Sequence, residues 1–214
     1  MGQRHSVDEP LIERARDGHR VAQQELWRVH RRWVAAIILA HRPRSVEVED
    51  LLQDVAVKFI DKLHTLREIQ AFRPWLRQIT LNVCRGAARS SRTTLRLGPS
   101  RQDGDGRDVG TVAEPASADT DVQLSAEQRD AAGLLMQQAL GLPVAYREPL
   151  LLRCLRSMSY QQIGDVMGLP VTTIETRLAR ARRMLREELR QLDDSFEDRT
   201  DFIGGRTDVP STTG

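Results

Sequence analysis

The stretch SYQQIGDVMGLPVTTIETRLARAR, residues 159–182, predicts two helices that meet at a tight turn. Ser159 and Gln162 have the S-x-x-Q spacing of a capping box, in which two free backbone N–H groups at a helix start are satisfied reciprocally. Gly168 can adopt the left-handed conformation that ends the first helix. Gly164 is small at the point where a second helix must cross closely. The stretch therefore predicts a helix-turn-helix.

The second helix of this motif is expected to begin near Thr172, which forms a further capping-box spacing with Glu175. An apolar stripe buries one side of it, and the opposite side carries short polar side chains followed by arginines. The candidate DNA-binding residues of this helix are Thr172, Thr173, Glu175, Thr176, Arg177, Arg180 and Arg183. Its first turn would approach base edges in the major groove and its later arginines would hold phosphates. Two alternatives stay open: a hairpin with a solvated arginine face, and a capping role alone for Glu175.

Helical periodicity also fills residues 8–95, which read as a bundle of about four helices. Leu52, Val55, Phe59 and Leu63 share one helical face, and Asp17-Gly18 marks a break between two earlier helices. Only 4% of the residues are aromatic and strand-like alternation is scarce. The sequence therefore predicts an all-α protein.

Charge divides the chain into blocks. The formal net charge is only +2, but residues 100–122 and 193–214 each hold six acidic residues and two arginines. Both segments are rich in turn-forming residues, which predicts a flexible acidic linker and a disordered acidic tail. The predicted divisions are a helical domain over 8–95, a linker over 96–125, a helix-turn-helix domain over 126–192 and a tail over 193–214. The two helical blocks are therefore strongly basic.

Several classes of protein are excluded by composition. The longest apolar run, residues 33–40, is far too short to span a bilayer, and no signal-peptide pattern opens the chain, so we expect a cytoplasmic protein without membrane insertion. Cys84 and Cys154 form no metal-binding spacing and are interpreted as small buried apolar residues, with redox sensing as the alternative. The five histidines fit no nucleophilic or metal arrangement, and His30 and His41 are interpreted as surface residues. We expect no enzyme activity, no metal and no cofactor.

Two sets of motifs resemble bacterial sigma-70-type factors, and the extracytoplasmic-function (ECF) group is the best match. Residues 142–153, 158–163 and 169–182 are similar to region 4 of that family. Residues 49–55, EDLLQDV, resemble region 2.2, and residues 72–82, FRPWLRQITLN, resemble region 2.4. The two sets occur in the family's order, which makes the resemblance more specific than a helix-turn-helix alone.

The resemblance implies a promoter-specificity subunit of RNA polymerase. Region 2 would dock on the clamp coiled coil of the β′ subunit and melt the −10 element, and region 4 would sit on the β flap and read the −35 element. The acidic linker would thread toward the active-site and RNA-exit channel. Core RNA polymerase and promoter DNA are the implied partners, and an anti-sigma factor is a further one.

Residue roles follow from the same resemblance. Candidate polymerase contacts are Asp50, Gln53 and Asp54, for which helix capping and solvation is the alternative. Candidate contacts to the −10 element are Leu66, Arg67, Arg77, Asn82, Arg85 and Arg89. Asn82 would hydrogen-bond an unpaired base, and the arginines of this helix would follow the backbone. Residues 63–71, where a flipped base would be held, contain no aromatic residue, and Trp75 is interpreted as a core residue.

Other functions remain as alternatives. A stand-alone helix-turn-helix regulator with a helical sensing or dimerisation domain is the second hypothesis, although it needs neither the region 2.2 motif nor an acidic linker. A hydrolase or other enzyme is the third and has no supporting motif. We also expect that the acidic tail could fold back on Arg177, Arg180 and Arg183 by mimicking phosphate.

Overall fold

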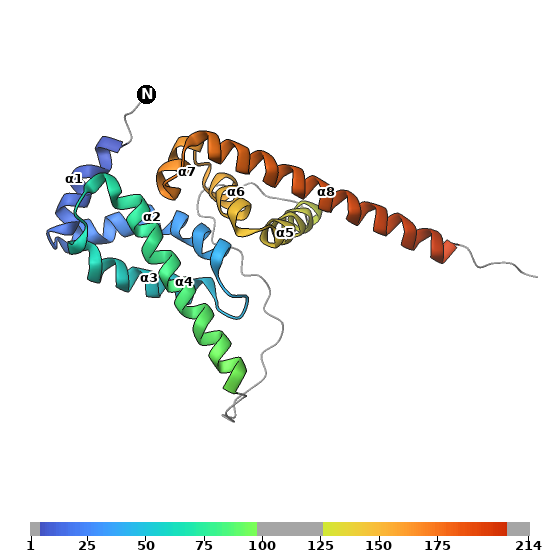
Figure 1. Ribbon diagram of the computed structural model, residues 1–214, viewed down its shortest axis with the longest axis horizontal. Helices are drawn as coiled ribbons and strands as arrows, with labels where there is room; N and C mark the ends of the chain where they lie inside the picture. The colour runs from blue at the N-terminus through green and yellow to red at the C-terminus, as the bar shows by residue number, and fades with distance from the viewer. Residues whose placement is uncertain (1–4, 98–125, 205–214) are drawn as a thin grey trace, which may run out of the picture.

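The computed structural model describes residues 5–97 and 126–204, and all the regular structure in these ranges is helical, which confirms the all-α class. Two groups of helices are apparent in Figure 1, one on each side of residues 98–125. The elements are α1 (His5–Arg16), α2 (Arg20–His41), α3 (Val48–Lys62), η1 (Leu63–Thr65), η2 (Ile69–Ala71), α4 (Phe72–Leu97), α5 (Ala126–Gly141), α6 (Val144–Arg156), α7 (Tyr160–Met167) and α8 (Val171–Gly204).

Helix α2 is the centre of the first group. The predicted break before it is confirmed: α1 ends at Arg16, and Gly18 takes φ +92°, a value that L side chains rarely adopt. Val34, Ile37 and Ile38 are fully buried, so the apolar run at residues 33–40 is the most enclosed part of the helix. Burying such a run requires helices on several sides. Here α1, α3, α4 and α6 surround α2.

An aromatic cluster joins α2, α3 and α4. The ring of Phe59 is fully buried, with its centroid 5.7 Å from that of Trp27 and 6.3 Å from those of Phe72 and Trp75. Trp75 is thus part of the core, as expected. His30 is only 3% exposed, so its interpretation as a surface residue is wrong. Its Nδ1 lies 2.8 Å from the Leu26 carbonyl oxygen, one turn earlier, which satisfies the polar ring within its own helix.

The helix-turn-helix is formed by α7 and α8, and its predicted turn is confirmed. The N–H of Gln162 donates to Ser159 Oγ at 3.2 Å, and the N–H of Ser159 donates to Gln162 Oε1 at 2.8 Å. Gly168 has φ +66° and ends α7. A Cβ on Gly164 would lie 2.8 Å from the backbone oxygen of Leu169, so this position has no room for a side chain.

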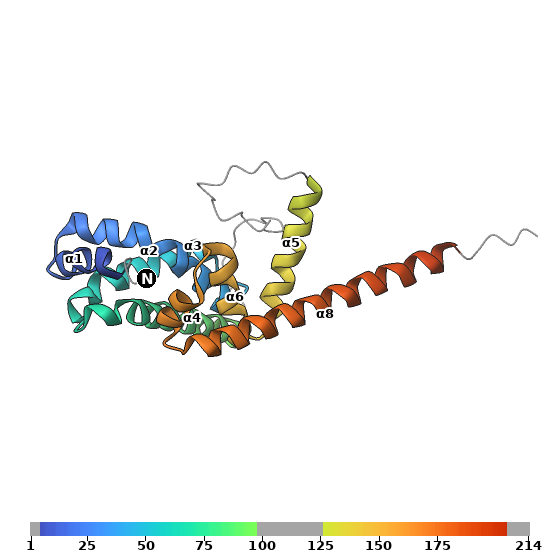
Figure 2. The ribbon, with the colours of Figure 1, turned by 90° about the horizontal axis from the view of Figure 1, so that it is seen from above.

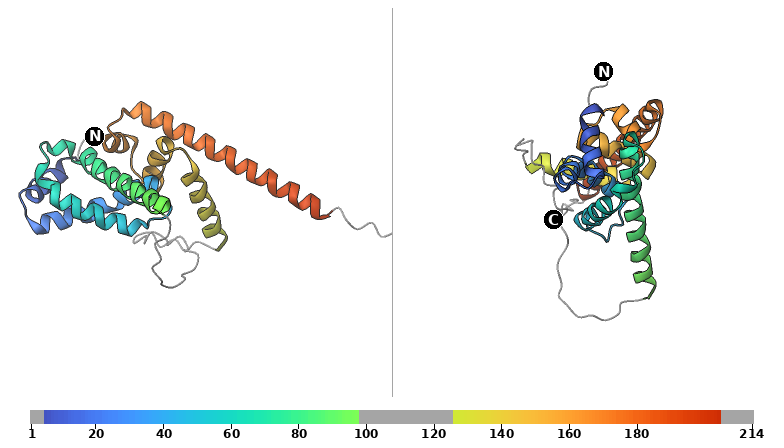
Figure 3. Two further views of the ribbon diagram at one scale, coloured as in Figure 1. Left: turned by 60° about the horizontal axis from the view of Figure 1, so that its bottom comes forward. Right: turned by 90° about the vertical axis from the view of Figure 1, so that its left-hand side faces the viewer.

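The two groups of helices share one hydrophobic core. Helix α6 packs against α2, and α7 packs against α4. Leu150, Leu151 and Leu152 of α6 are each at most 4% exposed. Figure 3 shows α6 and α7 beside the first group, while the C-terminal half of α4 extends away from it. Residues distant in the sequence therefore meet at a joint between the two groups.

The helix ends differ from the sequence prediction at two places. Helix α8 begins at Val171, and the Pro170 carbonyl accepts the N–H groups of Thr173 and Ile174, so the capping box predicted for Thr172 is wrong.

Helix α8 also continues to Gly204 because no glycine or proline interrupts residues 171–203. The prediction of a disordered tail is therefore wrong for residues 193–204. At 34 residues α8 is about 51 Å long, and Figure 2 shows it projecting from the body. Residues 205–214 and most of the linker, 98–125, lie outside the described residues.

Candidate nucleic-acid interface

The exposed face of α8 carries the seven residues predicted to contact DNA. Ile174, Leu178 and Ala181 are completely buried and attach the helix to the rest of the protein. That attachment turns the opposite face outward. On it, Thr172, Glu175, Thr176, Arg180 and Arg183 are exposed, and Thr173 and Arg177 are half-buried.

A shallow groove borders the start of this face. It is lined by Ala145, Tyr146, Thr172, Thr173, Thr176, Arg177 and Arg180. The guanidinium of Arg180 lies over the Tyr146 ring, 5.5 Å from its centroid, a cation–π geometry that restrains the arginine. Tyr146 was missed as a candidate, although it falls within the region 4 motif at residues 142–153. The groove combines hydroxyl groups with two cations, which suits contacts to phosphate and base edges.

Four of the six residues predicted to contact the −10 element lie exposed on α4 and the segment before it. Arg67, Asn82, Arg85 and Arg89 are exposed. Asn82 Oδ1 accepts hydrogen bonds from Gln78 Nε2 at 3.1 Å and from Arg85 Nη1 at 3.3 Å, so its amide is held in place at the surface. These four side chains can meet a nucleic acid without rearrangement of the core.

Two members of that predicted set are placed elsewhere. Leu66 is 4% exposed and belongs to the core, because the chain turns inward between η1 and η2. Its side chain does not lie at the surface where a base would bind. Arg77 points to the joint with α6, where its guanidinium binds Glu148. Neither residue is therefore included in the candidate −10 surface.

Helix α3 presents a separate face of mixed character. Asp50, Gln53 and Asp54, the predicted polymerase contacts, are all exposed. Val57 and Ile60, which sequence reasoning missed, are 68% and 52% exposed. The spacing of Gln53, Val57 and Ile60 by four and three residues, on the side opposite the buried Leu52–Val55–Phe59 stripe, is the signal that could have found them. Val57 and Ile60 are about one helical turn apart, so their exposed side chains form a small aliphatic patch among polar residues.

The joint between the helix groups contains a buried ionic cluster. The side chain of Glu148 on α6 is 2% exposed. Its Oε1 accepts from Arg77 Nε at 2.6 Å, and its Oε2 accepts from Arg77 Nη2 and from His41 Nε2, both at 2.8 Å. The prediction that His41 is an ordinary surface residue is wrong, since it ends α2 at this contact. Only the fold brings these three residues together, so no local pattern predicted the cluster.

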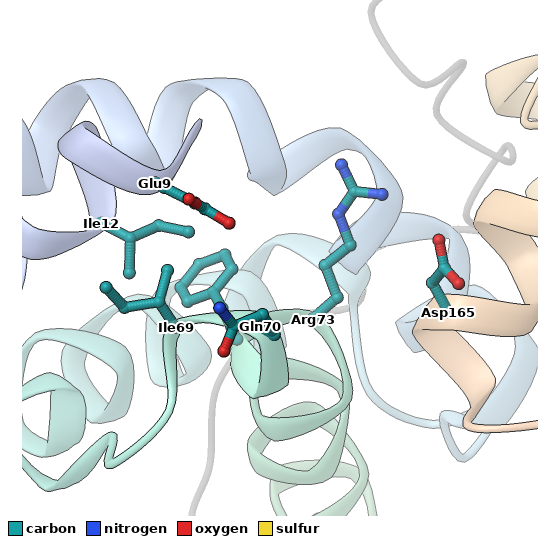
Figure 4. A pocket seen from close by; sticks show the side chains of 7 residues that line it. Glu9, Ile12, Ile69, Gln70, Arg73 and Asp165 are labelled. Atoms are coloured by element: carbon teal, nitrogen blue, oxygen red, sulfur yellow. The ribbon is translucent and has the colours of Figure 1, made fainter. Parts of the chain in front are cut away.

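A further cavity lies where α1, η2 and α4 approach α7. Glu9, Ile12, Ile69, Gln70, Phe72, Arg73 and Asp165 line it. In Figure 4 Ile12 and Ile69 lie together near Glu9 at one end, and Asp165 comes from a separate helix at the other end, with Arg73 between them. The described residues contain no group of three or more His, Cys, Asp or Glu side chains that could hold a metal ion. None of the described helices is long and apolar enough to cross a membrane.

The two cysteines differ in environment. Cys84 is 2% exposed, as interpreted from the sequence, and burial raises the pKa of its thiol to about 11. Cys154 is exposed on α6, so its interpretation as a buried residue is wrong.

This difference predicts selective thiol modification. Only a thiolate reacts readily with a disulfide reagent, so at pH 8 we expect one thiol per chain, that of Cys154, to react rapidly with Ellman's reagent. Cys84 should react only after urea unfolding. In the matched variant Cys154→Ser the rapid phase should vanish; two rapid thiols in the wild-type protein would contradict the burial of Cys84.

Comparison with known families shows which family the chain belongs to. The sequence model described as "Sigma-70 region 2" matches residues 26–94, and that described as "Sigma-70, region 4" matches residues 132–185. Together the two matches cover more than half of the chain. The chain belongs to the sigma-70 family. Region 2 of this sigma-70 protein thus contains most of α2, all of α3 and nearly all of α4, and region 4 contains the second part of α5, α6, α7 and the start of α8.

Individual relatives agree with this assignment. The probable RNA polymerase sigma factor RfaY of Xanthomonas campestris pv. campestris is 32% identical over 163 residues, which are 76% of this chain and 39% of that relative. The chain therefore spans about two fifths of the length of RfaY. The ECF RNA polymerase sigma-E factor of Haemophilus influenzae is 25% identical over 187 residues, 87% of this chain and 97% of that factor. The resemblance to the ECF group is confirmed.

A solved structure has a similar arrangement of helices. CnrH in complex with the cytosolic domain of CnrY matches with a TM-score of 0.54 and 26% identity, covering 86% of this chain and 97% of that one. The match extends across both regions of the sigma-70 protein.

Proposed function

We propose that this sigma-70 protein binds core RNA polymerase and directs promoter recognition, promoter melting and transcription initiation, with no enzymatic reaction of its own. One observation supports this most directly: a single chain combines a region 4 helix-turn-helix with an outward arginine face and a region 2 whose α3 face is open to a protein partner. We place its action in the cytoplasm, where bacterial polymerase meets DNA.

Region 4 would read the −35 element through α8. The short side chains of Thr172, Thr173 and Thr176 let the start of the helix approach base edges in the major groove. Glu175 stands beside them, clear of the helix start at Val171, and would accept a hydrogen bond from a cytosine amino group. Arg177, Arg180 and Arg183 would hold the phosphates and fix the register.

Region 2 would bind the −10 element along α4. Asn82 would hydrogen-bond the edge of an unpaired base, and Arg67, Arg85 and Arg89 would follow the strand's phosphates. The segment 63–71 contains no Phe, Tyr or Trp on which a flipped base could stack, a contact worth about 1–3 kcal/mol. Hydrogen bonding and charge would therefore carry more of the −10 preference than stacking.

The α3 face would dock on the clamp coiled coil of β′, and region 4 would sit on the β flap. Asp50, Gln53 and Asp54 would supply polar contacts around the aliphatic pair Val57 and Ile60, in the usual arrangement of an apolar centre with a polar rim. The acidic linker would run through the polymerase channel. An anti-sigma factor is a further partner, suggested by the complex of the similar CnrH with CnrY.

Reconstituted transcription tests this function. We expect run-off transcripts with defined start sites on genomic fragments only when the protein and core polymerase are both present. The protein alone should bind the same duplexes weakly. Tight sequence-specific duplex binding without polymerase, and no core-dependent open complex, would favour a stand-alone regulator instead.

A further inference from the structure

We propose that the Arg77–Glu148–His41 cluster, here called the joint cluster, is a latch that holds region 4 against region 2 in a closed form unable to engage both promoter elements at once. The inference rests on the proposed function for its consequence, but its structural basis is independent of that function. One carboxylate on α6 receives three hydrogen bonds from two other helices, α2 and α4. Opening the joint must break all three bonds.

Burial makes the joint cluster sensitive to the loss of any member. Desolvation by itself raises the pKa of Glu148, but the hydrogen bonds and charges of Arg77 and His41 outweigh it, and the pKa lies below its ordinary value. The carboxylate is therefore ionised, and an ionised group that is 2% exposed depends on its partners. Removing one partner of a buried ion pair destabilises a protein much more than replacing the whole pair by apolar residues.

Two arginines of α6 lie close to arginines of the first group of helices. Arg147 on α6 lies near Arg44, and Arg156 on α6 lies near Arg32 of α2. Burial, together with the like charge of the neighbour, lowers the pKa of each α6 arginine. The Nε atoms of Arg147 and Arg156 are also buried without a hydrogen-bond partner. The apolar contacts of α6 and the joint cluster therefore hold together an interface that also contains desolvated arginines.

The closed form is too short for a promoter. The −10 and −35 elements are about 25 base pairs apart, which at 3.4 Å per base pair is about 85 Å of duplex. Region 2 and region 4 here touch through α2–α6 and α4–α7. The helices that carry the two binding surfaces, α4 and the start of α8, therefore belong to groups that pack directly against each other. Binding to both elements must therefore separate α6 from α2, which exposes Glu148 and frees Arg77.

Distance measurement on the full chain tests the latch. Cys154 on α6 is exposed, and Val21→Cys places a second label on α2 at a position that is 74% exposed. With spin labels at both, the otherwise wild-type protein should give one short, narrow distance distribution. Glu148→Gln, which removes the charge and keeps the shape, should shift the main population to longer distances. The matched control Glu187→Gln, on the exposed surface of α8, should change nothing.

Several outcomes overturn the proposal. Arg77→Gln is measured in parallel, and circular dichroism identifies which variants keep wild-type helicity. An unchanged short distance in any such variant, or a broad distribution in the wild type, contradicts the latch. If both variants lose helicity, the cluster supports folding and the latch is also contradicted. Adding core polymerase and promoter DNA should lengthen the wild-type distance; failure of that step alone, with Glu148→Gln open, would contradict the proposed function and leave the latch intact.

Discussion

Gly164→Ala is expected to destabilise the helix-turn-helix and with it all −35-dependent transcription. The added Cβ would lie 2.8 Å from the Leu169 backbone oxygen, a position that cannot yield without moving the turn between α7 and α8. Overpacking of this kind costs about 1–3 kcal/mol, which corresponds to about a 5- to 150-fold increase in the unfolding equilibrium constant. Urea unfolding followed by circular dichroism measures the loss, and run-off transcription measures its effect on function.

Gly133→Ala is the matched control. Gly133 is an exposed residue within α5, and nothing lies within 4 Å of the position its Cβ would occupy. Alanine in a helix interior is favoured over glycine by about 0.5–1 kcal/mol, so this variant should be slightly stabilised. Equal stability changes in the two variants would mean that α7 and α8 cross less closely than described.

Replacing both Val57 and Ile60 with aspartate is expected to abolish binding to core polymerase while leaving the fold intact. Both side chains are largely exposed, so the substitutions remove little from the core. In the proposed complex each would be buried against β′, and fully burying an aliphatic side chain contributes about 1.5–3 kcal/mol. The loss of both anchors should weaken binding by at least about 100-fold. Fluorescence titration with core enzyme measures the affinity.

Val21→Asp supplies the comparison for this pair. Val21 is another exposed valine of the first group of helices, but it belongs to α2 and lies outside the α3 face. The Val21→Asp variant should bind core polymerase with wild-type affinity. If Val21→Asp weakened polymerase binding as much as the double substitution, α3 would not be the docking surface. Wild-type affinity of the doubly substituted protein would show the same.

Local signals in the sequence predicted local structure well. Ser159, Gln162, Gly164 and Gly168 specify the turn of the helix-turn-helix through groups at most a few residues apart, and each has the predicted geometry. The period of the apolar residues likewise located four helices before the linker. Such features depend on contacts within one turn or one helix face, which a single stretch of sequence contains.

Features that depend on contacts between distant residues are not predicted by local patterns in the sequence. Leu66 and His30 stand among polar residues in the sequence, yet the tertiary fold buries both. Arg77 belongs to a DNA-binding motif by resemblance, but Glu148, 71 residues away in sequence, engages it. The predicted end of α8 is too early for a different reason: acidic composition alone does not end a helix, and no glycine or proline occurs between Val171 and Gly204.

The sharing of one carboxylate among three helices limits how the protein can be recombined. A chimera that keeps this region 2 but takes region 4 from a relative would leave Arg77 and His41 facing whatever side chain replaces Glu148. An apolar residue there would leave the partly buried guanidinium of Arg77 without its carboxylate partner. The two regions are thus not freely interchangeable modules, and a hybrid factor must import positions 41, 77 and 148 as a set.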